Sequence, residues 1–250
     1  CSDTDGDTCD ECASGTVEPT DNDGDDFDCD GICDAGDSSV AGEITLNFSN
    51  ATETSIDIDY NLISCQGISG FQFHVNDEAV GGVDLISATD GALTVQYANN
   101  NVIAFDFDGA QLPTGEGSLA SLNFFAKLDG ATLELSNLLI GSAGGIEITV
   151  DGPGTADIVA CTNFDNDGFC DIDTDDDDDN DGSADADDSD DNNSYVCHDD
   201  DGDTCDECVS GTVEPTDNDG FDYDGDGACD AGDDDDDNDG ALDENDLDDG

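Results

Sequence analysis

Basic side chains are almost absent from this sequence of 250 residues. Lys127 is its single lysine or arginine and stands against 69 acidic side chains, which gives a formal net charge of −68. Such a chain gains nothing from counterion release on DNA, RNA or an anionic membrane surface, so we expect no nucleic-acid partner. Cations are the partners that this charge balance favours.

Long apolar runs and methionine are missing as well. No apolar run approaches the roughly 18 residues that a membrane-spanning helix needs, so we expect no membrane span. Without methionine, Cys1 is not a translational start, and we expect a processed product or part of a longer protein. Cysteine, by contrast, occurs 12 times, which favours disulfides and therefore an extracellular or cell-surface protein.

The residues that enzymes use for catalysis are also few. The sequence has two histidines. His74 lies in an alternating pattern opposite Phe71 and Phe73, which predicts an exposed strand histidine, and His198 corresponds to Ser2 in the repeat described below. Carboxylates are abundant, but their spacing assigns them to metal ligation. We predict no enzymatic activity, no catalytic residues and no organic cofactor.

Acidic residues are unevenly distributed and mark segment boundaries. Residues 38–160 contain 16 of the 69, and the other 53 lie on either side. The stretch CSDTDGDTCDECASGTVEPTDNDG at 1–24 returns as CHDDDGDTCDECVSGTVEPTDNDG at 197–220. These features predict an acidic repeat cassette at 1–37, a folded domain at 38–160, acidic loops at 161–196, a second cassette at 197–233 and a further loop at 234–250.

Short alternating apolar runs fill the central domain. Their β-branched and aromatic residues, separated by Gly-rich or Asn-rich breaks, predict an all-β sandwich with no helix of useful length. The predicted strands are 44–48, 55–60, 71–75, 93–97, 102–107, 119–125, 132–139 and 146–150. About 120 residues can bury a sizeable core, so we expect this domain to fold without metal.

Three of these runs resemble the cohesin family of bacterial surface and scaffold proteins. They are GISGFQFHV (67–75), VIAFDFDGAQLPTGEGSLASLNFFAKL (102–128) and GIEITVDG (145–152). The resemblance covers nearly all of 38–160 and implies a nine-stranded jelly-roll sandwich in a bacterial, extracellular protein. Cohesins of cellulosomes bind dockerins, while related modules serve as structural or adhesive units, so the resemblance does not by itself imply a dockerin ligand.

Outside this domain the acidic residues keep a fixed spacing, which we call the nine-residue frame: Asp at positions 1, 3, 5 and 9, and Gly at position 6. The segment DYDGDGACD at 222–230 shows it most clearly. Five loops match: Asp222, Asp224, Asp226, Gly227 and Asp230; Asp26, Asp28, Asp30, Gly31 and Asp34; Asn163, Asp165, Asp167, Gly168 and Asp171; Asp177, Asp179, Asp181, Gly182 and Asp185; Asp235, Asp237, Asp239, Gly240 and Asp243.

Other acidic groups fit the frame more loosely. The cassettes begin with sets that lack glycine at position 6, namely Asp3, Asp5, Asp7 and Asp10, and Asp199, Asp201, Asp203 and Asp206. A further set is Asp21, Asp23 and Asp25, whose second copy keeps Asp217 and Asp219 but has Phe221 in place of the third. The tract Asp171, Asp173 and Asp175 offers an extra ion site between two better loops.

The chemistry of these loops predicts multiple calcium ions. Calcium takes six to eight oxygen ligands, and alternate carboxylates converge on one ion where the backbone turns sharply at glycine. Magnesium, zinc at Cys9 and Cys12, and a solvated, disordered charge run at 175–179 and 187–191 are the alternatives. The spacing resembles thrombospondin type 3 repeats, which implies calcium- and disulfide-stapled loops over 1–37 and 161–250 with almost no apolar core.

The cysteines divide into paired sets. Cys1, Cys9, Cys12 and Cys33 match Cys197, Cys205, Cys208 and Cys229, and each set of four leaves three pairings open. Cys29 has no counterpart in the second cassette and Cys65 is alone in the sandwich, so we predict a disulfide between them, with a buried free thiol at Cys65 as the alternative. Cys161 and Cys170 are then left as a local pair.

Two functions remain after these exclusions, and a third, a calcium reservoir or mineral-nucleating protein, fits the excess charge but does not explain the sandwich. The first is a secreted, calcium-dependent structural protein, such as a spacer or a subunit of an extracellular filament or adhesin, assembling end to end as a homo-oligomer. The second is a binding module whose sandwich recognises a dockerin-type protein or a glycan while the repeats form a stalk.

Overall fold

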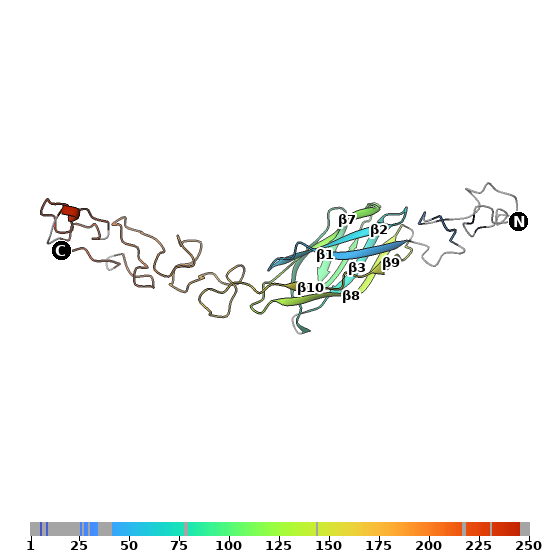
Figure 1. Cartoon of the computed structure of the whole chain (residues 1–250), viewed down its shortest axis with the longest axis horizontal. Coiled ribbons are helices and arrows are strands. Elements are labelled where there is room, and N and C mark those ends of the chain that lie inside the picture. Colours follow the sequence, from blue (N-terminus) through green and yellow to red (C-terminus); the bar gives the residue numbers. More distant parts are fainter. Residues whose placement is uncertain are drawn as a thin grey trace. The chain divides into compact units, whose positions relative to one another are not determined.

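A computed structural model describes residues 6, 9, 26, 28, 29, 31–34, 42–77, 80–143, 145–216, 219–230 and 232–245. The chain divides into two compact units, Cys1–Ala160 and Cys161–Gly250. The first unit contains a β-sandwich, and the second consists of irregular loops (Figure 1).

The sandwich packs two five-stranded sheets face to face, so the all-β fold expected from the sequence is confirmed (Figure 1). The strand order is β4-β7-β2-β1-β9 in one sheet and β10-β8-β3-β6-β5 in the other. The strands are β1 (Glu43–Ser49), β2 (Ser55–Ile63), β3 (Ile68–Val75), β4 (Leu85–Thr89), β5 (Thr94–Ala98), β6 (Asn101–Phe105), β7 (Gly115–Phe124), β8 (Ala131–Ser142), β9 (Thr149–Asp151) and β10 (Thr155–Ile158).

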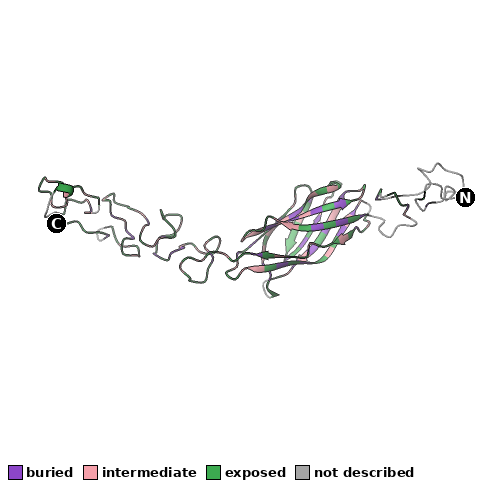
Figure 2. Cartoon of the chain, in the orientation of Figure 1, coloured by how far each residue is buried: buried purple, intermediate pink, exposed green. Residues whose placement is uncertain are grey.

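Sequence alternation determines which side chains form the core. In β2, Ile56, Ile58, Tyr60 and Leu62 are all buried, and the residues between them are only partly buried or exposed. Because successive strand residues point to opposite faces, one face of each sheet is apolar and meets the other sheet. Figure 2 shows this as buried residues alternating with exposed ones along the strands.

Bulges shift this alternation in the two longest strands. In β7 the pairing with β2 slips between Ile58 and Asp59, and Leu119 and Ala120 are buried side by side. In β8 the slip falls at Asn137, whose backbone is left-handed with φ 53°. A bulge inserts one unpaired residue and re-aims the side chains that follow it. Because the alternation changes phase at this bulge, the sequence predicted a strand only at 132–139, whereas β8 continues to Ser142.

The structure has ten strands in the described residues where the cohesin resemblance implied nine. Sequence patterns missed β4 and β10, which are edge strands with a single buried residue each, Ala88 and Ile158. Near the end of the sandwich, β9 pairs in parallel with β1, whereas β10 pairs with β8 in the other sheet. The intervening Gly-Pro-Gly at 152–154 allows this crossing because proline cannot donate to the ladder and Gly154 adopts φ 72°.

The second unit has a different interior. Its buried described residues are five cysteines and six polar residues: Cys170, Cys197, Cys205, Cys208, Cys229, Asp178, Asp179, Asp181, Ser183, Glu207 and Asp219. Its only regular element in the described part is a short 3-10 helix, η2 (Asp243–Asn245). Nowhere in the described chain is there a helix long and apolar enough to cross a membrane.

Candidate metal-binding loops

Six described loops share one backbone conformation, in which positions 4 and 6 of the nine-residue frame are both left-handed. This conformation is costly for residues other than glycine and is tolerated best by asparagine. At position 4, φ lies between 52° and 81°, and the residues are Cys29, Asn166, Asn180, Gly202, Gly225 and Asn238. At position 6 they are Gly31, Gly168, Gly182, Thr204, Gly227 and Gly240, with φ from 78° to 108°.

The frame carboxylates fold back onto the backbone of their own loop. In loop 177–185, the amide of Asp181 donates to Asp179 Oδ1 (3.1 Å), and the amide of Gly182 donates to Asp177 Oδ2 (3.0 Å). The same two bonds occur in loops 222–230 and 235–243. In loop 177–185 these Asx-type turns leave Asp177 Oδ1 and Asp179 Oδ2 without a hydrogen-bond partner in the described structure.

The carboxylate at position 9 closes the loop by accepting a hydrogen bond from the backbone amide at position 2. Asp185 Oδ1 accepts a hydrogen bond from the amide of Asp178 at position 2 (2.9 Å). Equivalent bonds join Phe164 to Asp171, Tyr223 to Asp230, and Asp236 to Asp243. The ninth carboxylate is therefore positioned beside the second residue of its loop.

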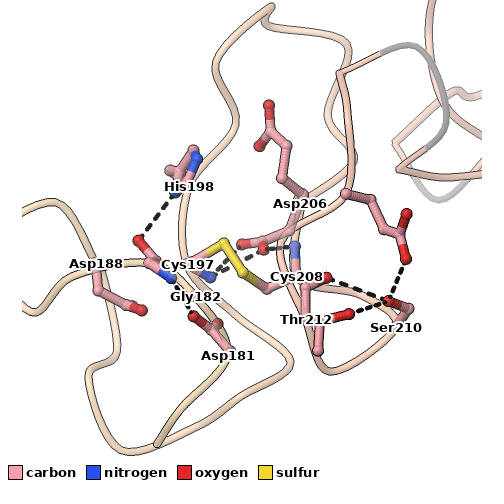
Figure 3. Close-up of a disulfide and its surroundings, with 12 residues drawn as sticks. Asp181, Gly182, Asp188, Cys197, His198, Asp206, Cys208, Ser210 and Thr212 are labelled. Carbon is pink, nitrogen blue, oxygen red and sulfur yellow. Dashed lines mark hydrogen bonds between the residues drawn. A yellow bond between two sulfur atoms is a disulfide. The ribbon is translucent and has the colours of Figure 1, made fainter. Parts of the chain in front are cut away.

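The first loop of the second cassette follows the same plan with different residues. Position 6 is Thr204, with φ 78°, in place of glycine, and position 9 is Glu207, whose Oε1 accepts from the amide of Asp200 (2.9 Å). Asp206, the residue expected there from its sequence spacing, instead accepts hydrogen bonds from the amides of Cys197 and Cys208 (Figure 3). We therefore replace Asp206 by Glu207 in this candidate loop, with Asp199, Asp201 and Asp203.

Loop 177–185 has the best-formed cluster of carboxylates. One oxygen each of Asp177, Asp179 and Asp181 lie within 4.8 Å of one another. Each residue has a buried oxygen without a hydrogen-bond partner in the described structure, and Asp181 is only 2% exposed. Burial raises the pKa of the Asp177 and Asp179 carboxyls, because the ionised form loses its hydration. Carboxylates buried in this position must either bind a cation or take up a proton.

A second cluster connects loop 163–171 with loop 177–185. Asp175 lies with Asp165 and Asp167 in one set and with Asp171 and Asp178 in another, each set within 4.8 Å. Burial, followed by repulsion from surrounding carboxylates, raises the pKa of Asp178 to about 6. Of the tract expected to hold an extra ion, the structure therefore brings Asp171 and Asp175 together with Asp178, which the frame did not predict.

Side-chain amides link consecutive loops. Asn180 at position 4 of loop 177–185 donates to Asp165 Oδ2 in the loop before it. Asn238, at the same position of loop 235–243, donates to Asp226 Oδ2 (2.8 Å). The amide of Ala228 and then the Asn238 side chain lower the pKa of Asp226, which favours its ionised form.

The first cassette is described at only a few predicted site residues. The amide of Gly31 donates to Asp26 Oδ2 (3.1 Å), as in the other loops, and Asp28 is buried. In the second cassette Asp219 is 3% exposed, and burial raises its pKa. The predicted residues that lie outside the described part are Asp3, Asp5, Asp7, Asp10, Asp21, Asp23, Asp25, Asp30 and Asp217.

Disulfides hold the loops and confirm two predicted pairs. Cys29 is bonded to Cys65, which joins the first cassette to the turn between β2 and β3, and Cys161 is bonded to Cys170. Of the three pairings left open for the second cassette, the structure has Cys197–Cys208 and Cys205–Cys229. Cys9–Cys33 matches the latter pair, while Cys1 and Cys12 lie outside the described residues.

The sandwich has an apolar groove on the outer face of the sheet containing β3. Its volume is about 450 Å³, and it lies around the cross-strand row Leu139, Gln72 and Ile103. Leu139 and Ile103 are 43% and 45% exposed. His74 lies on the face opposite Phe71 and Phe73, as predicted, but it is half-buried rather than exposed.

Solved structures similar to this chain include three cohesins. They are a non-cellulosomal cohesin from the archaeon Archaeoglobus fulgidus (17% identity, TM-score 0.35, covering 47% of this chain and 92% of that one), the seventh ScaB type I cohesin from Pseudobacteroides cellulosolvens (14%, 0.36, 49% and 94%) and the cohesin module of a family 33 glycoside hydrolase from Clostridium perfringens (10%, 0.34, 48% and 96%). No protein-family model matches the sequence, and no curated protein sequence matches it.

Proposed function

We propose that the chain is a calcium-binding structural module of a secreted or surface protein. The observation that supports this best is the set of buried, unpartnered carboxylate oxygens of Asp177, Asp179 and Asp181, converging within 4.8 Å in a loop whose backbone recurs elsewhere. An isolated buried carboxylate is costly, and several together are costlier because they repel one another. A divalent cation removes both costs, and hard oxygen ligands without nitrogen or sulfur favour calcium.

The expected stabilisation is large for a unit with no apolar core. If each loop binds calcium with a Kd of about 10⁻⁴ M, as extracellular modules do, millimolar calcium contributes about 1.4 kcal/mol per loop. Five of the six loops lie in the second unit and would then contribute about 7 kcal/mol to it, which is comparable with the whole stability of a typical domain. Calcium is therefore expected to decide whether the second unit is folded.

Calorimetric titration of the full, oxidised chain tests this function. We expect saturable calcium binding at several sites, weaker binding of magnesium, and loss of one site in Asp181→Asn. Asp187→Asn is the matched control, because Asp187 is an exposed aspartate outside the frame. An unchanged stoichiometry in Asp181→Asn, or no saturable calcium binding in the wild type, would contradict the proposal.

The structural role proposed here is end-to-end assembly into an extracellular filament or adhesin. Similar cassettes lie before and after the sandwich in the sequence, so a surface that docks on one can dock on the next copy. Electron microscopy of the native material should show fibres that come apart in a chelator. Monodisperse monomers in calcium would instead favour the binding module described next.

A second candidate function is recognition of a protein partner by the outer sheet face. The exposed Leu139 and Ile103 and the apolar groove beside them favour this function, because apolar side chains grouped on a surface commonly mark interaction sites. Ile103→Asp should abolish binding of such a partner without unfolding the sandwich. Binding of a glycan array by the unmodified face would assign the groove to carbohydrate instead.

A further inference from the structure

A histidine lies among the carboxylates of the second cassette. His198 immediately precedes loop 199–207, and its carbonyl accepts a hydrogen bond from the amide of Glu207 (3.0 Å). The imidazole Nε2 is 3.9 Å from Asp200 Oδ2, and Nδ1 is 3.4 Å from Ser183 Oγ. Figure 3 shows His198 next along the chain from Cys197, which is bonded to Cys208.

Three different side chains converge at this point. One ligand atom each of His198, Asp200 and Glu207 lie within 4.8 Å of one another. Glu207 is only 1% exposed, and its Oε2 is buried with no hydrogen-bond partner in the described structure. A fully buried carboxylate oxygen in this position requires a positive group, and this oxygen lies outside the Asp177–Asp181 set used above.

The Ser183 hydroxyl lies within hydrogen-bond distance of one imidazole nitrogen of His198. Ser183 is 5% exposed, and its amide donates to Asp181 Oδ1 (2.7 Å), which fixes the residue in place. If the hydroxyl accepts from Nδ1–H, the Nε2 lone pair faces the Asp200 carboxylate. Two electron-rich atoms 3.9 Å apart are too distant for a hydrogen bond, but they can both approach one metal ion at about 2.0–2.2 Å.

We propose that His198, Asp200 and Glu207 form a site for a transition-metal ion of the zinc class, at the edge of candidate loop 199–207, with which the site shares Glu207. Imidazole nitrogen suits zinc, copper and nickel, whereas calcium prefers oxygen ligands only. Three protein ligands and one water make an ordinary four-coordinate zinc site. Ser183 acts as a positioning residue, because a hydrogen bond to the second nitrogen fixes the tautomer and the ring orientation.

Zinc titration of the full chain in millimolar calcium tests this site. We expect one zinc ion that calcium does not displace, with about 100-fold weaker binding in His198→Ser, the residue that the first cassette carries as Ser2. His74→Gln is the matched control, since the chain has two histidines and His74 lies in β3. Binding that is equal in His198→Ser and wild type would overturn the site.

Two further measurements separate ligation from folding effects. Asp200 has a side chain that is 71% exposed, so Asp200→Asn should weaken zinc without affecting the disulfides or calcium stoichiometry. Ser183→Ala should weaken zinc about 10- to 100-fold and Ser183→Thr should restore it. In NMR spectra, zinc should shift the His198 ring signals alone. Ring signals of His198 that do not move when zinc is added would refute metal ligation.

Discussion

Removing the Cys29–Cys65 disulfide should destabilise the sandwich. The second cassette shows which residue can replace Cys29, because it carries glycine at the matching position. Cys29 occupies position 4 of loop 26–34 in a left-handed conformation, φ 60°, where the matching residue of the second cassette is Gly225. Cys65 lies in the turn between β2 and β3. The variant Cys29→Gly with Cys65→Ser therefore removes the cross-link without adding backbone strain at position 4.

The magnitude follows from the length of chain that the disulfide closes. Cys29 and Cys65 are 36 positions apart, and the closed segment contains β1 and β2. In the chain-entropy account, a loop of this size is worth about 3.8 kcal/mol, most of it from the unfolded state. Relief of left-handed strain at Cys29 offsets up to about 1–2 kcal/mol of that loss, leaving a net destabilisation of about 2–3 kcal/mol.

Denaturant unfolding of the full chain in calcium, followed by a signal from the sandwich, measures this loss. The matched control is Cys161→Ser with Cys170→Ser, which opens a local loop of 9 residues worth about 2.6 kcal/mol in the same account. The segment closed by Cys161–Cys170 contains none of the sandwich strands, so removing this disulfide should leave the unfolding transition of the sandwich unchanged. Equal unfolding midpoints for wild type and the Cys29/Cys65 variant would refute the reasoning.

Three other perturbations have defined outcomes. Gly182→Ala should destabilise its loop by about 1–2 kcal/mol, since φ is 100° while the new Cβ meets only Val213, at 3.8 Å; thermal unfolding in calcium measures this. Tyr60→Phe should cost the sandwich about 1 kcal/mol in denaturant unfolding, because its buried hydroxyl donates to the Pro113 carbonyl at 2.8 Å. The folded pKa of Asp178, about 6, exceeds its unfolded value, so its protonation favours the folded second unit at low pH, and that contribution is lost as pH rises through about 6. In a chelator, circular dichroism should therefore show more of the second unit folded at pH 5 than at pH 7, and the opposite order would contradict this prediction.

The sandwich could be predicted from the sequence wherever burial is one-sided. Alternation of apolar and polar residues correctly predicts the inward side chains of β2, including Ile56 and Ile58, because only one face of the strand meets the core. The same signal fails at edge strands such as β4, where Ala88 alone is buried, and at bulges such as Asn137, where the phase changes inside one strand. Those features depend on neighbours distant in sequence, which local periodicity does not report.

The candidate loops with glycine at position 6 were predicted in register, whereas the described loop without it was predicted with a different last carboxylate. Thr204 adopts the left-handed conformation that the frame requires, so its loop was placed with Asp206 as the last carboxylate instead of Glu207. Position 4 carried the missing signal. Asn or Gly recurs there in five of the six described loops, including Gly202 in this one, and it fixes the register without reference to position 6.

The two units differ in the kind of group that they bury, and so they should respond differently to solution conditions. Residues such as Ile58 and Phe124 fill the sandwich core, whereas the second unit buries cysteines and carboxylates such as Asp181 and Glu207. Apolar burial stabilises a fold with little dependence on ions, but buried carboxylates stabilise one only when cations or protons accompany them. On the calcium proposal, a chelator therefore acts on the second unit and leaves the sandwich folded. Calcium binding in loop 26–34 should still affect the stability of the sandwich, because the Cys29–Cys65 disulfide joins this candidate loop to the turn before β3.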